Sequence, residues 1–155
     1  MESFLAYNEG NLLGINSRLS SMRAPRRKRP LVRQLATWRD DRVALESLAE
    51  QVCYVGSPEH KDMPSFAGQP RPRADASICP RELTRDHARV ESWLRKAIRR
   101  GAVSELREGG FPRYVWFKGS NAVYEGRLVN RGLGEYKGYP LEPGQEPPTL
   151  DKLYD

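Results

Sequence analysis

The chain has 155 residues, of which 38% are apolar and 30% are charged, a composition that fits one modest domain with tails. No apolar run approaches the roughly 18 residues of a membrane-spanning helix, and the first residues lack the basic and then apolar order of a secretory signal. We therefore expect a cytoplasmic protein with no membrane partner. Its 26 lysine and arginine residues exceed its 20 acidic residues and give a net charge of +6, which makes a polyanion such as nucleic acid the first partner to consider.

The N-terminal residues 1–30 are expected to form a disordered basic arm. Residues 1–22 show no sustained apolar period, and Met22 is a second candidate for the start of translation. Residues 23–30 hold five cations together with two prolines, which oppose a continuous helix and favour an extended, solvated chain. Such an arm can bind phosphates, and its candidate contacts are Arg26, Arg27, Lys28 and Arg29.

The middle of the chain predicts two helical regions separated by a long loop. Apolar residues over 31–52 approximate helical spacing, and Asp40 and Asp41 either interrupt the apolar face or start a second helix. Residues 53–82 contain five prolines and two glycines, so we expect a proline-rich loop that is either functional or disordered. From Thr84, taken as a helix cap, a long apolar stripe predicts the strongest helix of the chain.

The residue pattern of the C-terminal part is typical of a β-sheet. Aromatic and β-branched runs at 114–117 and 123–129, separated by a short polar and glycine turn, predict a hairpin, and residues 135–139 predict a third strand. We expect an α+β fold with helices packed on one face of a small antiparallel sheet of three to four strands. The core domain is placed at residues 31–142, followed by an acidic disordered tail at residues 143–155.

Alternation along the predicted hairpin gives its outer face an aromatic and charged character. If Val115 and Phe117 point toward the helix, Tyr114 and Trp116 point away from it. Exposed rings on a sheet stack unpaired bases while nearby cations hold phosphates, which is how single-stranded RNA is usually bound. The alternative is that another element covers this face and the rings serve packing alone. The candidate nucleic-acid contacts are Tyr114, Trp116, Tyr124, Tyr136, Arg131 and Lys137.

His60 and Lys61 lie in a polar loop bounded by prolines, where packing does not explain them. A histidine with a pKa near about 6.5 can take a proton from a ribose 2′-hydroxyl, and adjacent cations can stabilise charge on the transition state, so that no metal is required. This combination fits RNA cleavage to a cyclic phosphate, with Arg113 and Arg127 as further contacts to phosphate and transition state. The alternative is a histidine that is merely exposed to solvent.

The four residues Cys53, His60, Cys79 and His87 are also the ligand types of a zinc site. Their spacings lack the close pairs that are typical of structural zinc, so we expect no metal; zinc would make His60 a ligand and not a base. The sequence contains no Walker loop, dinucleotide-binding fingerprint or nucleophile elbow, and we expect no cofactor. Both thiols are expected to stay reduced.

The order of the predicted elements resembles that of the small bacterial ribonuclease toxins grouped with colicin D, barnase and RelE, in which helices precede a compact antiparallel sheet that holds RNA. Roughly residues 54–140 carry the resemblance, and they are similar in detail to the catalytic domain of colicin D. The insert from Pro70 to Pro80 has no counterpart in that family. The matching segments are EHKD at 59–62, FAG at 66–68, the helix at 93–98 and GEYKGY at 134–139.

This resemblance implies that His60 is the general base and Lys61 its electrostatic partner, and that Trp116 or Tyr136 positions the substrate. It also implies an acidic inhibitor protein as a partner. The sequence therefore predicts a metal-independent endoribonuclease of bacterial toxin type, which cleaves RNA, with tRNA as one candidate. Two alternatives stay open: a non-catalytic basic protein that binds nucleic acid, and an interaction module that docks an acidic partner.

Overall fold

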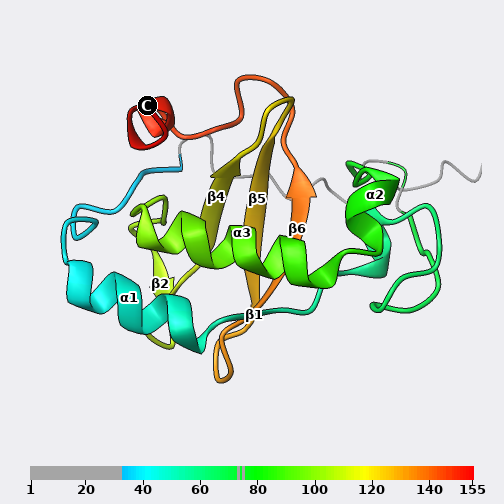
Figure 1. The fold of residues 1–155 in the computed structure, drawn as a ribbon, viewed down its shortest axis with the longest axis horizontal. Coiled ribbons are helices and arrows are strands. Elements are labelled where there is room, and N and C mark those ends of the chain that lie inside the picture. Colours follow the sequence, from blue (N-terminus) through cyan, green and yellow to red (C-terminus); the bar gives the residue numbers. More distant parts are fainter. Residues whose placement is uncertain (1–32, 73, 75) are drawn as a thin grey trace, which may run out of the picture.

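Helices on one face of a sheet form the body of the protein. The structure, a computed structural model, describes residues 33–155 except 73 and 75. Helices α1 (Arg42–Gln51) and α3 (His87–Arg99) lie side by side across one face of the sheet (Figure 1), so the predicted α+β class is confirmed. None of the helices within the described ranges is long and apolar enough to span a membrane. The expected arm contacts Arg26, Arg27, Lys28 and Arg29 lie outside the described residues.

The main sheet has the strand order β1-β6-β5-β4. Strands β4 (Tyr114–Lys118), β5 (Val123–Asn130) and β6 (Glu135–Pro140) form an antiparallel meander, which confirms the three predicted strands. Strand β1 (Cys53–Tyr54) pairs in parallel with β6, so the sheet is mixed and not wholly antiparallel. A two-residue strand is too short for alternation to reveal it in a sequence.

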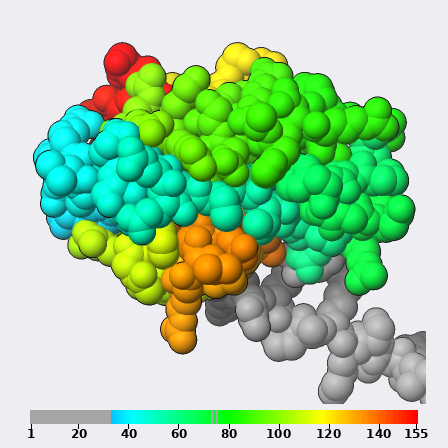
Figure 2. Space-filling view, turned by 60° about the horizontal axis from the view of Figure 1, so that its bottom comes forward, coloured from blue at the N-terminus to red at the C-terminus, as the bar shows by residue number. Residues whose placement is uncertain are grey.

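A separate hairpin packs against the turn between β5 and β6. Its strands β2 (Arg107–Glu108) and β3 (Phe111–Pro112) are joined by Gly109 and Gly110. Gly109 has a φ of 59°, and a side chain there would collide with the backbone oxygen of Arg131. Only glycine therefore allows the hairpin to approach the turn, and Figure 2 shows the two segments next to each other below α1.

Aspartates cap both long helices. The Asp41 carboxylate accepts a hydrogen bond from the Ala44 backbone N–H at 3.0 Å, so the first helical region holds one helix that starts after this aspartate. Helix α3 is capped in the same way by Asp86. Thr84, expected as this cap, instead ends the one-turn helix α2 (Arg81–Thr84). Aspartate and threonine are both good helix caps, so the sequence alone did not show which of Thr84 and Asp86 begins the helix.

Two paired glycines in the sheet let the helical layer pack closely. Gly126 on β5 and Gly138 on β6 are register partners. A Cβ at Gly126 would lie 3.4 Å from the Leu94 side chain of α3, and a Cβ at Gly138 would lie 3.3 Å from the ring of Tyr54. Both glycines therefore face the helices. Because side chains alternate along a strand, the opposite face of the sheet carries residues 125, 127, 137 and 139.

The proline-rich loop lies beyond the β6 edge of the sheet (Figure 1). Between β1 and α2 its described residues form only one isolated bridge, Ser65 with Gly68, and a short 3-10 turn, Pro58–His60, as expected for a loop. The Cys79 backbone N–H donates to the His60 oxygen at 2.9 Å, and the Cys79 thiol donates to the Gly138 oxygen at 3.6 Å. These bonds tie His60 to the edge of β6.

The C-terminal segment, expected to be an unstructured acidic tail, packs onto the domain instead. Its 3-10 helix η2 (Leu150–Leu153) contains Leu150, which is 1% exposed. The Tyr154 hydroxyl donates to the backbone oxygen of Trp116 at 2.6 Å, and burial raises the pKa of Tyr154 to about 12. The acidic, proline-rich composition of the segment gave no indication that Leu150 and Tyr154 pack against the domain.

Replacing Leu150 by alanine should lower the free energy of unfolding by about 2 to 5 kcal/mol, because a buried leucine loses its apolar contacts and leaves a cavity. Urea denaturation followed by tryptophan fluorescence measures this difference. Lys152→Ala is the matched control, since this side chain is exposed in the same turn. Equal stability of the two variants would show that the segment does not pack.

Candidate nucleic-acid interface

A buried glutamate lies on the sheet face that is turned away from α3. Glu125 on β5 is fully buried. Its carboxylate accepts hydrogen bonds from the Trp116 indole N–H, at 3.0 Å, and from the Tyr139 hydroxyl, and it forms an ion pair with Arg33. A buried carboxylate needs such donors to remain charged. The four residues join strands β4, β5 and β6 to the chain that precedes α1.

His60 stacks against this network. Its ring centroid lies 4.6 Å from that of Tyr139, with an angle of 28° between the rings. Nδ1 of His60 is 2.9 Å from the backbone oxygen of Ser77. Because a carbonyl oxygen only accepts hydrogen bonds, Nδ1 carries the proton of the neutral ring and Nε2 is the basic nitrogen. His60 is 2% exposed, so it is not merely a solvent-exposed loop histidine.

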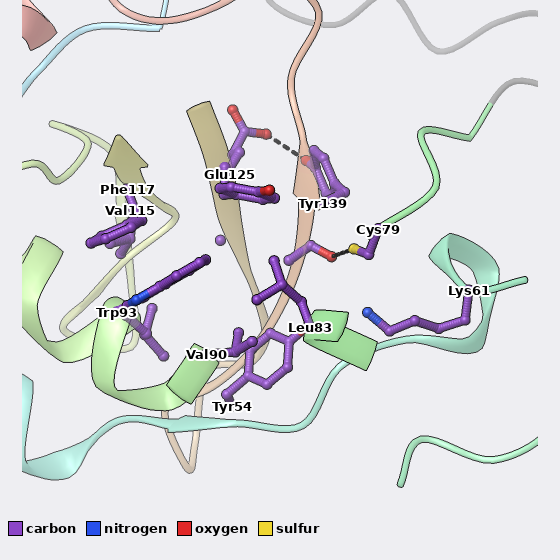
Figure 3. Close-up of a pocket in the computed structure, with 14 residues that line it drawn as sticks. Tyr54, Lys61, Cys79, Leu83, Val90, Trp93, Val115, Phe117, Glu125 and Tyr139 are labelled. Atoms are coloured by element: carbon purple, nitrogen blue, oxygen red, sulfur yellow. Dashed lines mark hydrogen bonds between the residues drawn. The ribbon is translucent and has the colours of Figure 1, made fainter. Parts of the chain in front are cut away.

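Lys61 points away from the His60 ring. The 3-10 turn ends at His60, and the backbone at Lys61 is extended, with φ −122° and ψ 142°, so the chain changes conformation between the two residues. The Lys61 side chain lines a cavity beneath α3 (Figure 3). The Cys79 thiol lies there too; burial raises the pKa of this thiol, and nearby Lys61 opposes the rise. The structure thus separates the two residues that the sequence placed at one reactive centre.

Four of the predicted cations line one groove, which we call the basic groove. It has a volume of about 540 Å³, and its charged lining consists of Glu59, Glu108, Arg113, Arg127, Arg131 and Lys137. Arg113 pairs with Glu108, and Lys137 lies 3.5 Å from Glu59. Neither Arg127 nor Arg131 forms an ion pair with a residue in the described part of the chain. Four cations against two carboxylates leave an excess of two positive charges.

The register of the sheet brings these cations together. Arg127 on β5 lies between its partners Tyr114 on β4 and Lys137 on β6, and Arg113 directly precedes β4. Arg131 follows β5 in the turn that packs beside the β2–β3 hairpin (Figure 2). Arginine and lysine side chains in this arrangement bind phosphate oxygens through charge-assisted hydrogen bonds. Residues distant in the sequence therefore form one surface with excess positive charge.

The rings expected to stack bases are mostly buried, which corrects the expectation of an exposed aromatic face. Trp116 and Tyr136 are fully buried and Tyr114 is 9% exposed, so none of them offers a face to a base. Trp116 does lie on the face away from α3, but its indole is taken up by the Glu125 network. Tyr124 is half-buried against Trp93 of α3, on the opposite side of the sheet. Large rings in a small domain fill its core first.

The zinc ligand set considered from the sequence is not assembled. His87 Nε2 lies 2.5 Å from the backbone oxygen of Tyr54, and His60 Nδ1 faces the oxygen of Ser77. Across residues 33–155 apart from 73 and 75, no three histidine, cysteine or acidic side chains gather in a metal-binding group. Backbone carbonyls hold both histidines.

Sequence reasoning missed Glu125 and Arg33. Glu125 is the register partner of Trp116, so the alternation that placed Trp116 on the outer face also places Glu125 there. A charged residue between aromatic and glycine positions of a central strand was the available signal. Arg33 carries no comparable signal, because it lies in irregular chain before α1.

The two parts of this face have complementary chemistry: the basic groove can hold phosphates, and Nε2 of His60 can accept a proton. No family model, no curated protein sequence and no solved structure matches the chain. The resemblance to ribonuclease toxins therefore stays a prediction from the sequence.

Glu125→Gln should lower the free energy of unfolding by about 3 kcal/mol, because the Arg33 guanidinium loses its buried carboxylate while the side-chain size is kept. Urea denaturation at neutral pH measures the effect. Glu142→Gln, at an exposed position, is the control for the loss of one negative charge. If the two variants are equally stable, Glu125 does not organise this face.

Proposed function

We propose that the protein is a metal-independent endoribonuclease of the bacterial toxin type, which holds the RNA backbone in the basic groove and cleaves it beside His60. The observation that carries this proposal is the junction between the groove and the histidine. Glu59 lines the groove and directly precedes His60. Lys137 also lines it, and stands two residues before Tyr139 on the same face of β6. RNA phosphates bound in the groove would therefore lie close to the imidazole.

The proposed chemistry uses the groups at this junction. Nε2 of His60 takes the proton of a ribose 2′-hydroxyl, whose oxygen attacks the adjacent phosphorus and displaces the 5′-oxygen, which takes a proton from water. The products end in a 2′,3′-cyclic phosphate and a 5′-hydroxyl. Arg127 and Arg113 neutralise the charge that builds on the phosphate oxygens in the transition state. Tyr139, fixed by its hydrogen bond to Glu125, holds the imidazole ring in place.

The burial of His60 sets a condition on this mechanism. At 2% exposure the ring reaches a ribose only if RNA binding uncovers it. The loop that carries His60 is held by isolated hydrogen bonds and not by a strand ladder, so its displacement costs less than that of a sheet strand. In this proposal the protein acts in the cytoplasm, and an acidic inhibitor protein would occupy the basic groove in place of RNA.

His60→Ala should reduce RNA cleavage by at least about 100-fold, the usual contribution of a general base. Purified protein is incubated with total RNA and with tRNA in EDTA, and the fragments and their end groups are read on a gel. Arg127→Ala should also lose most activity, whereas Arg81→Ala, an exposed arginine on α2, should keep it. Circular dichroism checks that each variant is folded. Full activity of folded His60→Ala would remove the proposed mechanism.

A non-catalytic protein that binds nucleic acid is the second candidate, and the burial of His60 favours it. The basic groove alone would then supply affinity, and His60 would serve packing against Tyr139. Both candidate functions require the basic groove for binding, but only the endoribonuclease cleaves the bound RNA.

Binding to single-stranded RNA should weaken steeply with salt, since each neutralised phosphate contributes about 0.7 to the logarithmic salt slope. Fluorescence anisotropy of a labelled oligonucleotide over a series of potassium chloride concentrations gives this slope. Arg127→Ala should reduce it by about 0.7, and Arg81→Ala should leave it unchanged. Salt-insensitive binding, or none at low salt, would argue against the groove in both candidates.

A further inference from the structure

A second cavity lies on the other side of the sheet, beneath α3, with a volume of about 50 Å³. Its floor contains the paired glycines Gly126 and Gly138, which leave sheet backbone uncovered by side chains. Figure 3 shows side chains from α3, from the sheet and from the proline-rich loop converging on it. Its apolar and aromatic walls are formed mainly by Leu83, Val90, Trp93, Leu94, Phe117 and Tyr124.

Lys61 places a positive charge in these apolar surroundings. The residue is 2% exposed, and its side chain lines the cavity. It forms no ion pair with any residue that the structure describes. Its neighbour Cys79 hydrogen-bonds to it, but burial raises the pKa of that thiol and so favours its uncharged form. Glu125 also borders the cavity, but its carboxylate is turned to Tyr139 and away from the lysine (Figure 3).

An ammonium group buried without an anion is unfavourable, and a bound anion removes the penalty. The volume of about 50 Å³ and the apolar lining restrict the site to a small anion. A single lysine balances one negative charge, and the apolar walls disfavour a multiply charged group such as a phosphate dianion. The half-buried rings of Trp93, Phe117 and Tyr124 suit a short apolar tail.

We propose that this cavity binds a small monocarboxylate with an apolar tail, whose carboxylate pairs with Lys61 and whose tail packs between α3 and the sheet. Tyr54 also lines the cavity, and its hydroxyl, which hydrogen-bonds to the Gly138 backbone, is the second donor that we assign to the carboxylate. The site lies on the opposite face of the sheet from the basic groove and does not depend on ribonuclease activity.

Thermal unfolding with sodium propionate as the probe tests the proposal, with sodium chloride at equal ionic strength and neutral propionamide as references. Propionate is small enough for the cavity and should raise the unfolding temperature of the parent protein in a saturable way, because a ligand that binds only the folded state stabilises it. Lys61→Met should lose this response, and its unfolding temperature without ligand should be at least that of the parent, since a buried unpaired charge is removed. Lys137→Met, a lysine paired with Glu59 in the groove, is the matched control and should respond like the parent.

A cavity-filling variant provides a second line of evidence that does not alter the charge. Leu83→Phe should weaken propionate binding at least about tenfold, measured by titration calorimetry. The proposal is overturned if propionamide acts as propionate does, if Lys61→Met or Leu83→Phe binds propionate like the parent, or if propionate has no effect beyond that of sodium chloride. In that last case the cavity serves only to hydrate Lys61.

Discussion

The buried carboxylate of Glu125 is the constraint on which the outer face of the sheet depends. A charge in the interior must be matched by donors, and here they come from an indole on β4, a hydroxyl on β6 and a guanidinium from the chain before α1. Meeting this demand fixes the relative positions of three strands and one irregular segment. It also fixes the Tyr139 ring, and through that ring the plane of His60.

The basic groove and the cavity beneath α3 lie on opposite faces of the same pair of strands. On β5 and β6, the paired glycines at 126 and 138 face the helices and leave the cavity that Lys61 enters. The neighbouring residue in each strand faces the other way; these residues are Arg127 after Gly126 and Lys137 before Gly138, and both line the basic groove. A shift of one residue in the register between β5 and β6 would exchange the residues on the two faces of the sheet. The register does shift between Leu128 and Asn130, but this irregularity lies beyond the pairs that line the groove and the cavity.

Local patterns predicted the meander, the two long helices and the irregular character of the proline-rich loop, because each depends on residues close together in the sequence. Alternation also placed Trp116 on the correct face. It failed to show that this face is closed, since that depends on the burial of Glu125 with Arg33, a contact across 92 residues of chain. The pairing of β1 with β6 is equally long-range and involves only two residues of β1. His60 and Lys61 were placed together because they are neighbours in the sequence, but the 3-10 turn ends between them, and the two side chains reach different faces of the sheet.

The docking of the C-terminal segment affects how the edge of the sheet can pair with other chains. Strand β4 is the last strand of the sheet, and its outer edge would offer unpaired backbone groups to other chains. The Trp116 N–H and the Tyr114 oxygen on this edge are paired with residues 102 and 104, and the Trp116 oxygen accepts the Tyr154 hydroxyl. The Tyr154 hydroxyl thus adds to the hydrogen bonds that occupy this edge along Tyr114–Trp116, where another strand could otherwise pair. Loss of Tyr154 would leave the Trp116 oxygen as an unpaired acceptor at this edge, the kind of group to which a strand of another chain adds.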